Sequence, residues 1–328
     1  MDRASGPDLV AAVTNAGGLG VVGGFGYTPQ NLRLLIEDTK KQLNREGAPF
    51  GVDLLLPQVG GNARKTNYDY TKGRLAELID IIIDEKAALF VSAVGVPPKW
   101  VVEKLHAAGI PVMNMVGHPK HVPKALEAGV DLICAQAGEG GGHTGDLPAS
   151  ILIPACVDAV KGHKSSLTGQ PIYVVGAGAI FDGRGLAANL AWGAQAVWVG
   201  TRFVASVESG APKKHKELLV SAGHGDTVKS LVYSGRPARL RLTPYIQNWH
   251  NERREQLEEH IAKGEVPWNL ELEKHPEKML ESYPYPMGQV SAVINDILPA
   301  KKIVDNMVNQ AATILQHGST LVKAQAKL

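Results

Sequence analysis

The sequence lacks the features that mark secreted, membrane or nucleic-acid-binding proteins. It contains only two cysteines, Cys134 and Cys156, both in apolar stretches, so we expect buried thiols in a reducing compartment, not a disulfide framework. No apolar run is long enough to span a bilayer, and the first residues show neither a secretory signal nor an Arg-rich transit pattern. The formal net charge of only +2 argues against nucleic-acid and membrane partners. We therefore expect a cytoplasmic protein.

Two common kinds of catalytic motif are also missing. No set of His, Cys, Asp and Glu has the spacing of zinc ligands, so no metal is expected. No G-x-S-x-G nucleophile elbow is present. One basic cluster, Arg236, Arg239 and Arg241, is interpreted as a solvated loop and not as a binding patch.

What the chain does contain is a regular alternation of strands and helices. Its 328 residues, 44% of them hydrophobic, suffice for one large barrel or two smaller domains. Seven continuous apolar stretches alternate with helical segments, which is typical of parallel strands covered on both faces. The predicted strands cover residues 19–22, 50–56, 89–93, 110–116, 130–135, 171–175 and 195–199.

The number of strands decides between two α/β architectures. A closed TIM-type (β/α)8 barrel needs eight strands, whereas this chain opens on a helical segment and supplies seven. We predict such a barrel over residues 1–208 with its first strand missing from this chain, and keep an open doubly wound sheet as the alternative. Residues 209–328 show helical patterns without strands and are expected to form a helical region packed on the barrel.

The most distinctive stretch is the glycine-rich loop that follows the fifth predicted strand. Residues 135–146 contain five glycines, including Gly141, which would let a ligand approach the backbone closely. His143 stands at the far end of this loop and is the candidate catalytic residue. The alternative interpretation is a flexible loop with a solvent-exposed histidine.

Two further glycine-containing loops follow the last two predicted strands, where barrels often bind phosphate. Backbone N–H groups of Gly176, Gly178, Gly200 and Thr201 could hold an anion there, although tight packing of strand against helix explains the glycines equally well for either loop alone. A Rossmann fingerprint is a poor fit because Phe181 stands where its third glycine would be. The phosphate loops and the bare backbone of the glycine-rich loop together suggest FMN as the cofactor.

In this arrangement Gln136 is predicted to hydrogen-bond the flavin ring, with His143 on the substrate side. Taken together, these motifs resemble the nitronate monooxygenase family, formerly called 2-nitropropane dioxygenases. The matching segments are residues 5–7, 15–20, 49–52, 140–145, 176–180, 200–203 and 287–289, with residues 59–65 closest to fungal-type members.

The resemblance implies an FMN-dependent barrel that oxidises alkyl nitronates or nitroalkanes with O2 to carbonyl compounds and nitrite. It implies His143 as the base or the substrate-orienting group, and a homodimer is a candidate assembly. In the family a first strand ends in a segment that contacts the flavin, and here only Met1 stands at that point. Asp53 replaces an asparagine of many bacterial relatives and would lie near the flavin pyrimidine, where it would disfavour an anionic reduced ring.

Two other functions remain open at this point. The same barrel and the same Gly-Gly-His loop resemble FMN-dependent NAD(P)H reductases of the enoyl-thioester reductase type. A catalytically idle flavin-binding protein is the third hypothesis, and the missing first strand is the observation that keeps it open. Nitronate oxidation is the hypothesis that accounts for most of the motifs.

Overall fold

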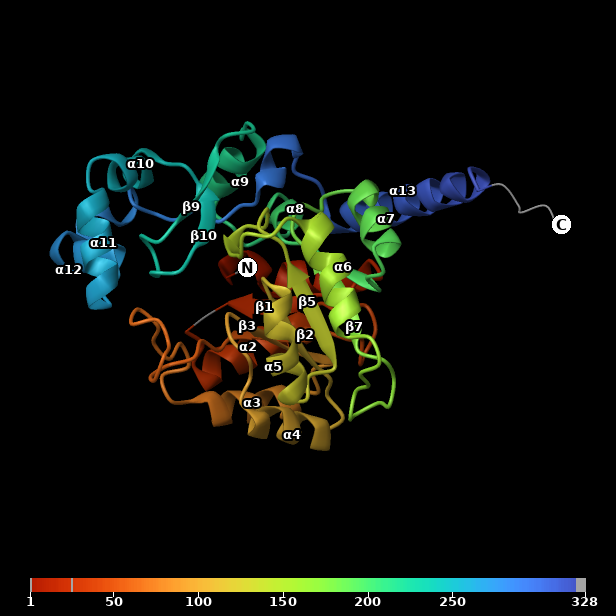
Figure 1. Ribbon diagram of the computed structural model, residues 1–328. Helices are drawn as coiled ribbons and strands as arrows, with labels where there is room; N and C mark the ends of the chain where they lie inside the picture. The colour runs from red at the N-terminus through yellow and green to blue at the C-terminus, as the bar shows by residue number, and fades with distance from the viewer. Residues whose placement is uncertain (1, 25, 323–328) are drawn as a thin grey trace.

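The computed structural model describes residues 2–24 and 26–322, and its centre is a curled sheet of seven parallel strands (Figure 1). Adjacent strands follow one another in chain order, whereas a doubly wound sheet would reverse its order partway along. This order excludes the doubly wound alternative and confirms the barrel-type α/β fold. The strands are β1 Val21–Gly24, β2 Gly51–Leu55, β3 Leu89–Ala93, β4 Val112–Val116, β5 Leu132–Gln136, β7 Tyr173–Ala177 and β8 Ala196–Trp198.

Helices cover the outer face of this sheet, because the strands are apolar on both faces and need a second layer. Local signals fix where they start: the Thr28 hydroxyl accepts a hydrogen bond from Asn31 N–H at 3.1 Å, and Asp182 accepts one from Arg184 N–H at 3.0 Å. The helical segments of this part are η1 Asp2–Ser5, α1 Pro7–Asn15, α2 Pro29–Lys41, α3 Leu75–Asp84, α4 Lys99–Ala107, η2 Pro119–His121, α5 Val122–Glu127, α6 Ala149–Ala159, α7 Gly183–Ala191 and α8 Thr201–Val204.

The C-terminal part is not purely helical, so the expectation of helices without strands is wrong. Strands β9 Thr227–Ser230 and β10 Ala238–Arg241 pair antiparallel, and β10 also pairs with β6 Gly142–His143 inside the glycine-rich loop. The four-residue strands carry Lys and Arg, which hid them from the hydrophobic pattern. The helical segments here are α9 Lys213–Val220, α10 Pro244–Asn251, α11 Arg254–Lys263, α12 Pro267–Lys274, η3 Pro276–Met279, η4 Gln289–Val293 and α13 Ala300–Thr320.

The basic cluster of β10 is also not the solvated loop that we expected. Arg239 is buried, and its Nε and Nη2 donate to the Gly138 carbonyl oxygen at 3.1 and 3.0 Å. Arg241 pairs with Asp226 at 2.7 Å. The glycines of this loop offer no side-chain donors for its carbonyl oxygens, and Arg239 supplies the donors for the Gly138 carbonyl oxygen.

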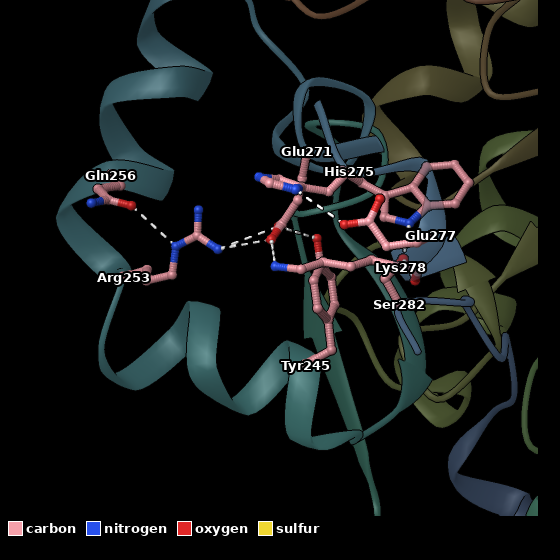
Figure 2. A network of polar contacts seen from close by, with 9 residues as sticks. Tyr245, Arg253, Gln256, Glu271, His275, Glu277, Lys278 and Ser282 are labelled. Carbon is pink, nitrogen blue, oxygen red and sulfur yellow. Dashed lines mark hydrogen bonds and ion pairs between the residues drawn. The ribbon is translucent and has the colours of Figure 1, made fainter. Parts of the chain in front are cut away.

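A carboxylate in the middle of α12 links the peripheral helices by hydrogen bonds (Figure 2). Glu271 accepts hydrogen bonds from the Tyr245 hydroxyl at 2.8 Å and the Lys278 ammonium at 3.1 Å, and Arg253 Nη1 lies 3.3 Å from it. Because the Glu271 side chain is only 10% exposed, these bonds are poorly screened by water and link α10, α12 and the segment after α12. The connection matters because Trp268 of α12 lines the cavity described below.

Both cysteines are free and buried, as predicted. Within residues 2–24 and 26–322, no helix is both long enough and apolar enough to cross a bilayer.

Candidate active site

A cavity of about 2060 Å³ opens at the carboxyl ends of the parallel strands. In barrel enzymes the active site lies at this end, where the loops after the strands meet. The ends of β2, β4, β5 and β7 form its floor, and the segment before β10 and the peripheral helices form one wall. Gln136 and residues 140–146 of the glycine-rich loop also line the cavity.

His143 lines this cavity and is held in place from two sides. Its backbone pairs with Ala238 of β10, and its Nε2 lies 2.8 Å from the Ser234 hydroxyl oxygen. Burial and the nearby positive charge of Arg236 lower the pKa of His143 to about 4. The imidazole is therefore neutral at physiological pH, and its position is fixed, unlike that of an exposed loop histidine.

The glycine-rich loop is clamped by a distant segment, residues 287–289. A Cβ atom on Gly141 would lie only 2.7 Å from Gly288 N, so only glycine allows this close approach. Gln289 N–H donates to the Glu139 carbonyl oxygen at 2.9 Å, and Gly288 N–H donates to the Thr201 hydroxyl at 2.9 Å. The clamp connects the glycine-rich loop with the start of α8, and its hydrogen bond to Thr201 is buried.

Gln136, at the end of β5, stabilises the same loop. Its Nε2 donates to the His143 carbonyl oxygen at 2.8 Å and lies 3.5 Å from the Gly141 carbonyl oxygen. The amide N–H groups are thus used within the protein. Only the Oε1 atom is left as the group with which Gln136 could contact a ligand in the cavity.

Two buried polar oxygens that line the cavity have no hydrogen-bond partner among the described residues. They are Oδ1 of Asp53 on β2 and Oδ1 of Asn114 on β4. Burial raises the pKa of Asp53 to about 6. Asn114 is fixed through its Nδ2, which donates to the carbonyl oxygens of Ser92 and Gly95 at 2.9 and 2.7 Å. An unpaired buried acceptor costs free energy, so this pair marks a place for a ligand that donates hydrogen bonds.

The two predicted phosphate loops differ from one another in the structure. Gly178 and Ala179 both have positive φ values, 98° and 57°, and line the cavity. The positive φ values turn the backbone sharply after β7, at the edge of the cavity where the sequence predicts a phosphate-binding loop. Gly200 and Thr201 line the cavity too, at the start of α8.

Gly176 does not line the cavity. A Cβ atom there would overlap the Asn189 side chain, so this glycine serves the packing of β7 against α7. The structure thus favours the packing explanation at Gly176. Met1 lies outside the described residues, and the remaining predicted cofactor contacts stay predictions. The predicted residues that the cavity brings together are Asp53, Gln136, Gly141, His143, Gly178, Gly200 and Thr201.

Sequence analysis missed three residues of the site: Asn114, Ser234 and Arg236. Asn114 is a polar residue within an otherwise apolar predicted strand, and that position could have identified it. Ser234 and Arg236 lie more than 90 positions after His143, in a segment that gave no strand signal. In the part of the chain that the structure describes, no group of three or more His, Cys, Asp or Glu side chains could hold a metal ion.

Comparison with known proteins identifies similar chains over nearly the full length. The sequence profile named nitronate monooxygenase matches residues 1–310. A Mycobacterium tuberculosis protein named 5-hydroxy-7a-methyl-1-oxo-octahydro-1H-indene-4-carboxyl-CoA dehydrogenase is 30% identical, covering 98% of this chain and 94% of that one.

Two solved structures resemble this fold over nearly all of both chains. FabK from Thermotoga maritima shares 29% identity with a TM-score of 0.79, covering 98% of this chain and 94% of FabK. The nitroalkane oxidase from Streptomyces ansochromogenes shares 25% identity with a TM-score of 0.79, covering 96% of this chain and 94% of the oxidase.

Proposed function

The chain belongs to the nitronate monooxygenase family of flavin-dependent oxidoreductases, and we propose that it uses FMN to oxidise alkyl nitronates with O2. The products would be a carbonyl compound and nitrite. The observation that carries this proposal is the cavity at the strand ends, in which a fixed neutral histidine and a cationic arginine accompany unpaired acceptors and an anion-binding loop. Similarity to a nitroalkane oxidase supports it.

The residues around the cavity fit a flavin. The unpaired oxygens of Asp53 and Asn114 could accept a hydrogen bond from the N–H group of the ring. The backbone N–H groups at Gly178 and Ala179 would hold the phosphate, together with those of Gly200 and Thr201. When bound, FMN would supply the two-electron oxidation chemistry, which no side chain of the site provides.

His143 suits the orientation of an anionic substrate better than the removal of a proton. A general base works best when its pKa lies near the working pH, and a pKa of about 4 makes this imidazole a weak base at neutral pH. The Ser234 hydroxyl accepts from the backbone N–H of Arg236 at 3.4 Å, and its single proton can go either to His143 Nε2 or to the Arg236 carbonyl oxygen at 3.4 Å. If it goes to Nε2, the ring proton of His143 resides on Nδ1. Nδ1–H could then donate to a nitronate oxygen. We therefore propose the preformed nitronate as the preferred substrate.

A second candidate function is the oxidation or reduction of an acyl-CoA thioester. The Mycobacterium relative is named a carboxyl-CoA dehydrogenase, and the cavity is far larger than a small nitronate requires. Lys120 and Lys124 line the outer part of the cavity without carboxylate partners among the described residues, where the phosphates of coenzyme A could bind.

A visible spectrum under anaerobic conditions separates these functions. The protein, purified with excess FMN, should show flavin absorbance that bleaches or shifts when propyl-2-nitronate is added, and should release nitrite once air is admitted. A flavin spectrum that ignores the nitronate but bleaches with NADH would favour the reductase. A protein that remains colourless after purification with excess FMN does not bind flavin. That result would refute both enzymatic functions and the flavin-binding role as well.

A further inference from the structure

Arg236 is a half-buried cation with no anion beside it. Its Nη1 donates to Asn67 Oδ1 and its Nη2 to the Val94 carbonyl oxygen, both at 3.1 Å. Both acceptors are neutral. A guanidinium carries five N–H donors, so three of them find no hydrogen-bond acceptor among the described residues.

No carboxylate in the described part of the chain compensates the charge of Arg236; of its neighbours, Tyr70 favours the cation and Arg64 opposes it. No carboxylate of the described residues lies within ion-pair distance of it, and Asp69, in the adjacent loop, uses its oxygens to accept from the backbone of Thr71 and Gly73. A second cavity-lining guanidinium, Arg64, is close enough that it and burial together lower the pKa of Arg236. Holding an unpaired cation out of water is costly, and proteins normally supply a counter-charge.

The other arginine of this segment provides a comparison. Arg239 is also buried without a carboxylate partner, but its Nε and Nη2 are both taken by the Gly138 carbonyl oxygen and it does not line the cavity. Arg236 instead lines the cavity together with His143, and the Ser234 hydroxyl joins the two residues. The counter-charge that Arg236 lacks can therefore come from a ligand in the cavity.

We infer that Arg236 is the substrate-binding residue that pairs with the charged end of a planar oxyanion, and that it selects nitronates over neutral nitroalkanes. This inference rests on the proposed function, which it deepens by assigning the residue that recognises the substrate charge. The flat fork of a guanidinium matches the two coplanar oxygens of a nitronate, in the way that it matches a carboxylate. Asn67 and the Val94 carbonyl oxygen fix the orientation of that fork.

Nitrate is a suitable probe because it is planar, carries one negative charge and is not a nitronate. We would titrate nitrate into the FMN-supplied protein by calorimetry, comparing wild type with R236Q, R236K and R45Q. Arg45 is exposed and lies away from the cavity, so R45Q removes the same charge without touching the site. Loss of a charged hydrogen-bonded pair should weaken nitrate binding roughly tenfold to hundredfold in R236Q. R236K should be intermediate, and R45Q should match wild type.

Steady-state kinetics on propyl-2-nitronate provide the second measurement. The R236Q substitution should raise KM by a similar factor and lower kcat less. Nitrate binding that is absent in wild type, or equally strong in R236Q, would overturn the inference even if nitronate is turned over. Nitrate binding that depends on Arg236 in a protein that does not oxidise nitronates would instead uphold the anion site and refute the proposed function. R236K is the control for a folding defect, because it keeps the positive charge and loses only the planar geometry of the guanidinium.

Discussion

The substitution Asp53→Asn should stabilise the protein in the absence of flavin, and the gain should grow with pH. Asp53 is only 4% exposed, and its Oδ1 accepts no hydrogen bond from the described residues. Burial raises its pKa to about 6, whereas the same group in the unfolded chain titrates near 4. Asparagine fills the same space and never ionises, so it avoids the cost of a buried carboxylate.

The sign and size of the effect follow from the linkage between proton binding and folding. Between about pH 4 and pH 6 the unfolded chain has lost the proton and the folded protein still holds it, so stability falls as pH rises. A pKa difference of about two units, at about 1.4 kcal/mol per unit, corresponds to about 3 kcal/mol. The ionisation of Asp53 therefore lowers the free energy of unfolding of the wild-type protein by about 3 kcal/mol between pH 4 and pH 7. The difference between D53N and wild type should therefore increase by that amount from pH 4 to pH 7.

Urea unfolding of the flavin-free protein at pH values from 4 to 8 measures this difference directly. Glu46→Gln is the control, because Glu46 is exposed and has no hydrogen-bond or ion-pair partner among the described residues, so its loss should leave the unfolding free energy close to that of wild type. If the gap between D53N and wild type were independent of pH, Asp53 would have the same pKa in both states and the argument from burial would be wrong. A gap that shrank as pH rose would mean that the carboxylate is stabilised by a positive partner.

Four other predictions test the site and its support. Since His143 is proposed to orient the substrate, His143→Ala should lower kcat/KM on propyl-2-nitronate and on 2-nitropropane by the same factor, roughly tenfold to hundredfold; a much larger loss on 2-nitropropane in initial-rate assays would restore the base role. With a pKa near 4, His143 should produce no limb in the pH profile of kcat/KM above about pH 5, and R236Q should move its titration upward because a neighbouring cation is lost; a limb near pH 6.5 in wild type would contradict the burial argument. Gly141→Ala should destabilise the protein by about 1 to 3 kcal/mol in urea, since the new Cβ would displace Gly288, and unchanged stability would show that the clamp yields easily. For Glu271→Gln, two cations lose their shared carboxylate, so a proteolysis assay should cut the peripheral helices faster than in wild type, whereas equal rates would make the network dispensable.

The sequence predicted the central sheet well because parallel strands are uniform in composition. Residues 89–93 form β3 as predicted, and the seven apolar stretches all correspond to strands of one sheet. The same rule failed for β9 and β10, because those strands are short and charged; they pair with one another, and β10 also pairs with β6 of the glycine-rich loop. A pattern of apolar residues does not predict strands whose role is to supply hydrogen bonds to the backbone of another segment.

The candidate site was predictable only where glycine and histidine mark it locally. His143, Gly141 and Gly178 could be identified because a bare backbone after a buried strand is unusual in itself. Gly176 is an exception to that argument, because the absence of a side chain there makes room for Asn189 and not for a ligand. Arg236 gave a misleading signal: an arginine in a polar segment is usually solvated, and only its burial beside His143 gives it a role.

The pairing of β10 with the glycine-rich loop also explains why the histidine and the arginine can act as a unit. Ala238 pairs with His143 in the small antiparallel sheet, so the segment that carries Ser234 and Arg236 cannot shift without shifting His143. Burial, together with the positive charge of Arg236, keeps the imidazole neutral, and a neutral imidazole does not compete with Arg236 for the negative charge of a substrate. Arg236 would therefore bind the negative charge of the substrate, and His143 would orient the substrate. Such a division favours a substrate that arrives as an anion over one that must first be deprotonated in the cavity.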